Sequence, residues 1–212
     1  MSYSKEQVRG LLLKLADMID ENKQMLTDLD AAIGDGDHGH NMARGFDAAR
    51  VKLAQGPAEQ DAEAMLKATA MALISNVGGA AGPLYGTLFL KGAATVKGKE
   101  ELGLPDLADF LKAGIEGVQL RGKAILGEKT MLDVLIPVQA SIAADAESGE
   151  PAPQSLEKAA ALARACAEKT KEIAATKGRA SYLGERSIGH IDPGAMSSCL
   201  MIETLAELVK GG

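Results

Sequence analysis

A short acidic segment, residues 30–41, carries the side chains best suited to chemistry. It holds three carboxylates, two imidazoles and three glycines. Asp35 and Asp37 are two residues apart, so an extended backbone points both to the same side, and Asp30 can close the cluster from the end of a preceding helix. Carboxylates this close repel one another unless a cation binds between them. We therefore predict a divalent cation site, with a run of solvated turn residues as the alternative.

Two known motifs match this segment only in part. Gly34, Gly36 and Gly39 have the spacing of a dinucleotide-binding loop, but Asp35 and Asp37 would repel a bare pyrophosphate and no β-branched strand precedes them. An EF-hand calcium loop would need other residues at its later ligand and turn positions. An all-oxygen carboxylate cluster remains, which is how proteins hold Mg²⁺ while substrate phosphates complete its coordination. The segment would then bind phosphate through the metal.

Two further connections are candidates for contact with an anion. Residues 78–83 are glycine-rich, so a ligand can lie on bare backbone just before a helix, although close helix packing at a tight turn explains them equally well. Residues 121–131 offer cations and a hydroxyl beside a helix start. Taken alone, they are typical of an ordinary solvated loop.

A fourth segment, residues 177–194, is longer than most connections in compact proteins and is therefore a functional candidate. It carries Arg179, Arg186, His190 and Asp192. Arginines there can neutralise phosphate or transition-state charge, or form surface ion pairs. All three histidines of the chain lie either here or in the acidic segment. This concentration indicates a site assembled at one end of a set of helices.

Composition indicates that helices position these segments. Aromatic residues make up 3% and hydrophobic residues 46% of the chain, a balance that favours helices over strands and suffices for one core. We predict a single domain, residues 1–212, of the all-α class: a bundle or barrel of eight antiparallel amphipathic helices with the site at one end. Periodicity and breakers place the helices at 4–27, 40–55, 58–76, 83–97, 105–121, 130–147, 153–176 and 193–210.

Charge and hydropathy exclude several classes of partner. The net charge of −6 argues against nucleic acid. Residues 68–90 contain no charge and could span a bilayer by length, but Asn76 and the glycines around residue 79 predict two helices that meet at a turn. The polar N-terminus lacks the apolar stretch of a signal peptide, so we expect a cytoplasmic protein with no membrane contact. Cys166 and Cys199 are expected to be buried and reduced.

Four blocks of the sequence together resemble the nucleotide-binding L subunit of dihydroxyacetone kinase. They are residues 33–42, 77–86, 127–133 and 178–194, and they occur in family order over nearly the whole chain. The resemblance implies a barrel of eight antiparallel helices with the nucleotide at one end. This agrees with the helices counted from periodicity.

The resemblance also implies roles for single residues. Asp30, Asp35 and Asp37 would bind two Mg²⁺ ions that bridge the phosphates of ADP or ATP, and with Arg179 they would form the catalytic group. The nucleotide would be contacted by His38, Gly39, His40 and Asn41 along the phosphates, Ala80 and Ala81 through the glycine-rich turn, Gly122 and Met131 at the adenine, and Arg179, Asp192, Pro193 and Gly194 in a closing loop. Family members often carry Ser or Thr where this chain has Ala80 and Ala81, so only backbone N–H contacts remain there.

The implied reaction needs other proteins, because nothing in this chain resembles a site for a small ketose. In the family, a K subunit holds dihydroxyacetone, and a phosphohistidine M subunit of the phosphotransferase system recharges bound ADP in the branch that this chain resembles. A homodimer or hetero-complex is expected, and a transcription regulator is a further candidate partner. The alternatives are an ATP-dependent sugar or fatty acid kinase nucleotide subunit, and a nucleotide-sensing interaction protein.

Overall fold

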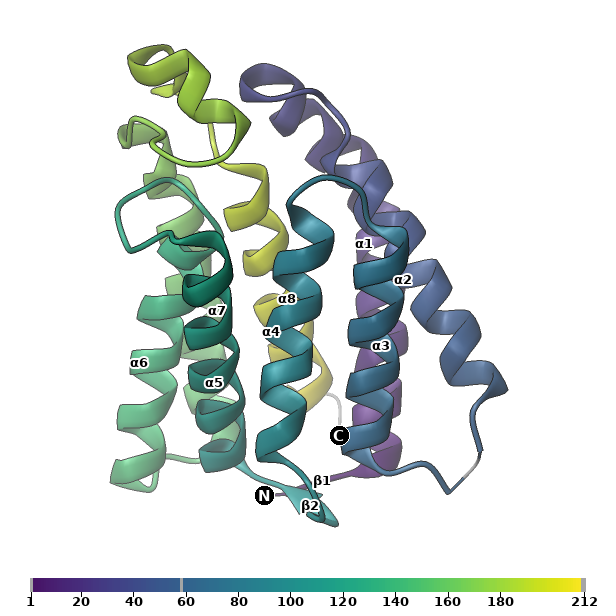
Figure 1. Ribbon diagram of the computed structural model, residues 1–212. Coiled ribbons are helices and arrows are strands. Elements are labelled where there is room, and N and C mark those ends of the chain that lie inside the picture. The colour runs from purple at the N-terminus through teal and green to yellow at the C-terminus, as the bar shows by residue number, and fades with distance from the viewer. Residues whose placement is uncertain (1, 58, 211–212) are drawn as a thin grey trace.

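The protein folds into a closed ring of helices (Figure 1). The computed structural model describes residues 2–57 and 59–210, and eight antiparallel α-helices lie within them. They are α1 (Lys5–Ile33), α2 (His38–Gln55), α3 (Ala62–Asn76), α4 (Ala81–Thr95), α5 (Leu104–Gly122), α6 (Leu132–Ser148), α7 (Ala152–Lys169) and α8 (Pro193–Lys210). Each helix packs on the next one in the sequence, and α8 packs on α1. The predicted all-α barrel is confirmed.

The inside of the ring is filled by the apolar stripe of each helix. On α1, Leu12, Leu15, Ile19 and Leu26 recur at helical spacing and are buried. The buried face of α7 is made largely of alanines, Ala159, Ala163 and Ala167. Such small side chains let α7 lie close to α6 and α8. One continuous core therefore holds all eight helices in fixed relation.

Because the helices alternate in direction, their N-termini alternate between the two ends of the barrel. Helices α1, α3, α5 and α7 begin at the end that carries two short antiparallel strands, β1 (Tyr3–Ser4) and β2 (Glu101–Leu102), which we call the strand end. Helices α2, α4, α6 and α8 begin at the opposite end, which we call the loop end. All four segments that the sequence marked for chemistry lie at the loop end (Figure 1).

Two predicted helix ends are wrong. The first helix was expected to stop at residue 27 but continues to Ile33, because no breaker occurs before Gly34. Asp30 therefore lies in the last turn of α1. The seventh helix was expected to reach residue 176 but ends at Lys169. There the Thr170 hydroxyl donates to the carbonyl oxygen of Ala167 at 2.6 Å, and a 3₁₀ turn, η1 (Thr170–Glu172), follows.

One predicted helix start lies outside the described residues, because the third helix was expected to begin at residue 58. In the structure α3 begins at Ala62, after Asp61, whose side chain accepts from the backbone N–H of Ala64 at 2.7 Å. The uncharged run 68–90 is divided between α3 and α4, as expected. Among the described residues, no helix combines the length and apolar character that a membrane span requires.

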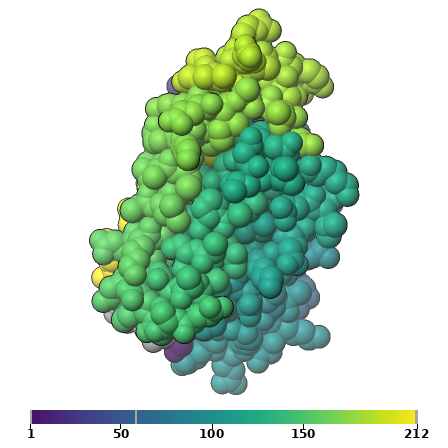
Figure 2. Space-filling view, turned by 90° about the vertical axis from the view of Figure 1, so that its left-hand side faces the viewer, coloured from purple at the N-terminus to yellow at the C-terminus, as the bar shows by residue number. Residues whose placement is uncertain are grey.

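The long connection before α8 is partly helical rather than a plain loop. It contains the 3₁₀ segment η2 (Arg179–Ser187), and in Figure 2 this part of the chain stands above the ends of the helices. Ala180 and Leu183 pack against Ile33 and Ala175 to form a small apolar cluster separate from the main core. The end of α1 therefore supports η2.

Candidate functional site

A cleft with a volume of about 520 Å³ opens at the loop end. All four marked segments contribute to its lining. Of the residues predicted to bind metal or nucleotide, the cleft is lined by Asp30, Asp35, Asp37, His38, Ala80, Ala81, Gly122, Met131, Arg179, Asp192, Pro193 and Gly194. Residues more than 160 positions apart in the sequence thus meet in one space.

The acidic segment forms a compact carboxylate cluster. Asp30 is buried, Asp35 and Asp37 are exposed, and one oxygen of each lies within 4.8 Å of the others. Gly34 permits this approach, because a Cβ there would lie 2.2 Å from Asp30 Oδ1. Three carboxylates and no nitrogen or sulfur ligand suit a hard divalent cation such as Mg²⁺. The residues present therefore fit the predicted metal.

Asp30 has a second task, which is to hold the start of α2. Its Oδ2 accepts from the backbone N–H groups of Asp37 at 2.8 Å and His38 at 3.1 Å. Asp37 is the N-cap of α2, but its own side chain makes no capping hydrogen bond. A residue of α1 thus replaces the local cap. The cluster and the helix start are therefore fixed together.

Arg179 brings η2 to the cluster. Its Nε lies 2.9 Å from Asp35 Oδ2, and 66% of its side chain is exposed. An ion pair so open to solvent adds little to stability. The guanidinium can therefore exchange Asp35 for another anion at small cost.

The start of α4, at the loop end, has backbone N–H groups without a side-chain cap. Three of the four helices that begin there have a side-chain acceptor near the first turn: Asp30 for α2, Thr130 for α6 and Asp192 for α8. Among the described residues, α4 has no such acceptor, and a Cβ on Gly79, just before this helix, would meet no atom within 4 Å. Free N–H groups at a helix start attract anions. The glycine-rich turn is therefore suited to phosphate.

A buried polar network forms the floor beneath His38. Its Nε2 lies 3.0 Å from Ser197 Oγ, and the Tyr85 hydroxyl, 2.7 Å from the same oxygen, donates to the carbonyl oxygen of Gly194 at 2.9 Å. Burial lowers the pKa of His38 to about 4. The imidazole is therefore neutral near pH 7. Tyr85 and Ser197 could not be predicted from the sequence, because hydroxyls within apolar helices give no local signal.

Apolar side chains also line the cleft. Leu84, Val118 and Leu132 line it beside Gly122 and Met131. A Cβ on Gly122 would lie 3.1 Å from Leu84 Cδ2, so a larger residue would narrow this space. The cleft thus has a charged part and an apolar part, as a ligand with phosphates and an aromatic base requires.

Three predicted nucleotide contacts do not line the cleft. Gly39 packs α2 against α1, since a Cβ there would lie 1.9 Å from the carbonyl oxygen of Lys23. His40 is exposed, and the Asn41 side chain accepts from Arg44 at 2.7 Å. None of these three residues is part of the lining. Of the other residues in the long connection, Arg186 and His190 are exposed and do not line it either.

Residues 121–131, which taken alone are typical of a solvated loop, are exposed in part and buried in part. Lys129 is 1% exposed and lines the cleft. Asp133 organises the loop around it by accepting from the backbone N–H groups of Gly127 at 2.6 Å and Thr130 at 2.7 Å. A lysine between Glu128 and Thr130 gives no sign of burial in the sequence. Its environment depends on distant segments.

The chain matches a known protein family, described as the DAK2 domain, over residues 32–207. It is 44% identical over 210 residues to the "PEP-dependent dihydroxyacetone kinase, ADP-binding subunit DhaL" of Escherichia coli (strain K12), with 99% of this chain and 100% of that protein covered. It is also 44% identical over 196 residues to the "PTS-dependent dihydroxyacetone kinase, ADP-binding subunit DhaL" of Lactococcus lactis subsp. lactis (strain IL1403), with 92% and 93% covered.

The fold is also similar to a solved structure, the dihydroxyacetone kinase from C. freundii in complex with AMP-PNP and Mg²⁺. The TM-score is 0.75 at 23% sequence identity, and the match covers 98% of this chain and 34% of that chain. The barrel of this chain thus corresponds in shape to about a third of that enzyme.

Proposed function

Because the chain belongs to the DAK2 domain family, we propose that it is the ADP-binding subunit of a phosphotransferase-system-dependent dihydroxyacetone kinase. It is then a phosphotransferase with an alcohol group as acceptor. The observation that carries the proposal is the cleft, in which a carboxylate cluster and an uncapped helix start face the same space. The likeness to ADP-binding subunits over nearly the full length of both chains supports it.

In this proposal the carboxylate cluster holds Mg²⁺, as two ions, and is formed by Asp30, Asp35 and Asp37. Bound magnesium neutralises charge on the phosphate oxygens during transfer. Asp30 orients the cluster because its Oδ2 is fixed by two backbone N–H groups of α2. Both of these bonds go to Oδ2, so Oδ1 of Asp30 would be available to a metal ion.

The remaining residues position the nucleotide and offset its charge. The free N–H groups at the start of α4, around Ala80 and Ala81, donate to phosphate oxygens. Arg179 leaves Asp35 and pairs with the phosphoryl group being transferred, which stabilises the transition state electrostatically. The neutral His38 contributes a hydrogen bond rather than a charge. Phosphoryl transfer requires such positioning and little covalent participation.

The apolar part of the cleft takes the adenine. Gly122 and Met131 lie against the base, and the segment Asp192 to Gly194 closes the space between base and phosphates. Apolar walls exclude water from the bound nucleotide, which protects a high-energy phosphate from hydrolysis. ADP can then remain bound between turnovers as a coenzyme.

Two partners complete the reaction. A phosphohistidine protein, the M subunit, passes its phosphoryl group to bound ADP, and the resulting ATP passes the group to dihydroxyacetone on a K subunit. Both exchanges take place in the cytoplasm. Docking on a transcription regulator stays a prediction.

The first test is to identify what copurifies with the protein. We expect mass spectrometry of denatured protein to find about one ADP per chain, and radiolabelled phosphate to move from the phosphorylated M subunit to that ADP. Asp35→Asn protein is the control and should retain little label. A chain that carries no nucleotide, or that turns over fully with free ATP while its bound ADP stays unphosphorylated, would contradict the proposal.

A further inference from the structure

One buried cation at the cleft has no part in the steps above. Lys129 lies in the connection between α5 and α6, and its backbone φ of 63° is in the left-handed region that few residues other than glycine adopt. Its side chain is among the largest that are fully buried. A charged group in such a position costs free energy unless it is paired. The contacts of the Lys129 ammonium therefore indicate the role of this residue.

The Lys129 ammonium joins three separate parts of the chain. Its Nζ donates to the carbonyl oxygen of Thr170 at 2.6 Å and to that of His190 at 2.5 Å. Thr170 follows α7 directly, and His190 lies two residues before Asp192. Burial lowers the pKa of Lys129, and the charges of Asp192 and Asp133 oppose this shift. The two carbonyls and two nearby carboxylates thus compensate the buried charge.

Glu128, the residue before Lys129, contacts the chain just before η2. Glu128 Oε1 accepts from the Thr176 hydroxyl at 3.0 Å, and the backbone oxygen of Glu128 accepts from the N–H of Thr176 at 3.5 Å. Two consecutive residues of one loop therefore form hydrogen bonds with the two ends of the segment 176–190, which contains η2. We call Glu128 and Lys129 together the clasp.

We propose that Lys129 is a positioning residue that, through the clasp, holds η2 and the start of α8 over the cleft and so sets how long the nucleotide stays bound. This inference rests on the proposed function. Arg179 and Gly194 are carried by the segments that the clasp holds. Removing the ammonium would take this donor from the carbonyl oxygen of His190 and would leave that of Thr170 only the backbone N–H of Ile173, at 3.2 Å. Opening of the segment would then become easier.

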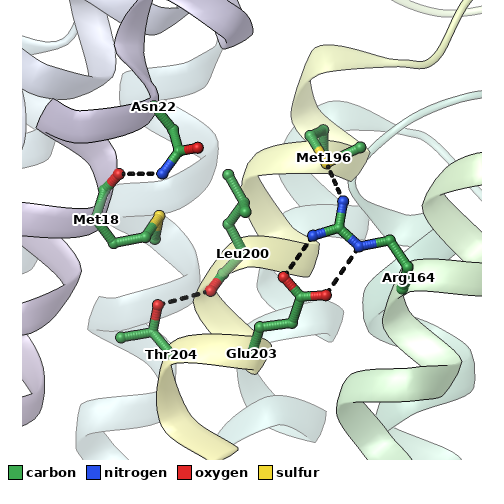
Figure 3. A network of polar contacts seen from close by, with 7 residues as sticks. All are labelled: Met18, Asn22, Arg164, Met196, Leu200, Glu203 and Thr204. Carbon is green, nitrogen blue, oxygen red and sulfur yellow. Dashed lines mark hydrogen bonds and ion pairs between the residues drawn. The ribbon is translucent and has the colours of Figure 1, made fainter. Parts of the chain in front are cut away.

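The test compares Lys129→Met with a control that weakens the same helices elsewhere. Arg164 of α7 donates from Nε to Glu203 Oε1 of α8 at 2.9 Å and from Nη2 to Oε2 at 2.6 Å, and Nη1 contacts Met196 Sδ at 3.2 Å (Figure 3). None of the three residues lines the cleft. Arg164→Met therefore removes an α7–α8 tie without touching the clasp.

Two quantities are measured on both variants and on the unchanged protein. The first is hydrogen exchange at Gly189, Asp192 and Ala195 without nucleotide, because their backbone N–H groups donate hydrogen bonds at the end of the segment 176–190 and at the start of α8. The second is the rate of Mg-ADP release. For Lys129→Met we expect both to rise about tenfold or more, since a hydrogen bond to a charged donor is lost. Arg164→Met should leave both rates near those of the unchanged protein.

Two further variants keep the test decisive. If Lys129→Met does not fold, Lys129→Gln replaces it, because its amide keeps N–H donors without the charge. Both rates should then rise by less than is expected for Lys129→Met. Glu128→Ala should speed exchange near Thr176 more than near Asp192. Equal rates in the Lys129 variants and the Arg164 control would overturn the clasp. Absence of ADP binding by the unchanged protein would refute the proposed function instead, while exchange without nucleotide would still report on the clasp.

Discussion

The two ends of this barrel differ in how the helices that begin there are capped. At the strand end, three of the four helix starts are capped by residues close to them in sequence: Ser4 and Gln7 form a capping box on α1, Asp61 caps α3, and Asp106 accepts from the N–H of Gly103 before α5. The fourth helix, α7, has no side-chain cap but carries Pro153 in its first turn, and a proline has no N–H to satisfy. At the loop end, α2 depends on Asp30 of another helix, and α4 has no side-chain cap. Local caps make the strand end self-sufficient, whereas the loop end leaves groups free for a ligand.

The cavity at the strand end and the cleft at the loop end also differ in the chemical character of their lining. An apolar cavity of about 150 Å³ lies toward the strand end, lined by residues such as Leu12, Leu88 and Phe110. The larger cleft at the loop end brings Asp30, Lys129 and Asp192 into one space. Desolvated charge at one end and apolar space at the other indicate that recognition of a polar ligand is confined to the loop end.

The largest expected effect comes from Asp30, where the metal cluster and a helix start coincide. Asp30→Ala should lower phosphoryl transfer by at least about a hundredfold, and should reduce the free energy of unfolding by about 2 kcal/mol because two N–H groups of α2 lose their acceptor. Transfer assays and urea denaturation measure the two effects. Normal stability in this variant would contradict the cross-helix cap.

Asp35 separates the two roles, because it is exposed and caps no helix. Asp35→Asn should lower transfer by about a hundredfold while the free energy of unfolding changes by less than about 0.5 kcal/mol. Measured beside Asp30→Ala, it shows whether activity and stability are joined only at Asp30. A large loss of stability in Asp35→Asn would contradict the view that only Asp30 joins the metal cluster to the stability of the fold.

A third test uses pH, because burial raises the pKa of Asp192 to about 7. In the unfolded chain the value is about 3.9, so between these values the folded protein binds a proton that the unfolded chain releases. The stability contributed by Asp192 is complete below about pH 4 and is lost as pH rises through about 7. Relative to Asp192→Asn, the metal-free protein should lose about 2 kcal/mol between pH 5 and 7. Parallel pH profiles of denaturation would disprove this.

The smallest effect is expected at the strand end. Ser4→Ala removes the acceptor for the N–H of Gln7 and should lower the free energy of unfolding by about 1 kcal/mol. Affinity for Mg-ADP, measured by calorimetry, should stay unchanged, since Ser4 is at the far end from the cleft. A parallel loss of affinity would mean that the two ends are coupled through the core.

The sequence predicted the parts of this molecule that depend on local pattern. Helical spacing and breakers give eight helices, and the crowding of Asp35, Asp37 and Asp30 gives the carboxylate cluster. The burial of Lys129 could not be predicted, because its partners are backbone carbonyls 41 and 61 residues away. Tyr85 was missed for the same reason. The specific nucleotide contacts rested on family resemblance and remain predictions.

The contact between α8 and α1 that closes the ring has a consequence for synthesis of the chain. The carboxylate cluster emerges from the ribosome early, but the segment from Asp192 to Gly194 and the last wall of the barrel emerge late. Until then α1 and α7 each lack a neighbour, and a nascent chain exposes apolar faces that require protection. We expect nucleotide binding to begin only after α8 has left the exit tunnel, so truncated products should not sequester ADP.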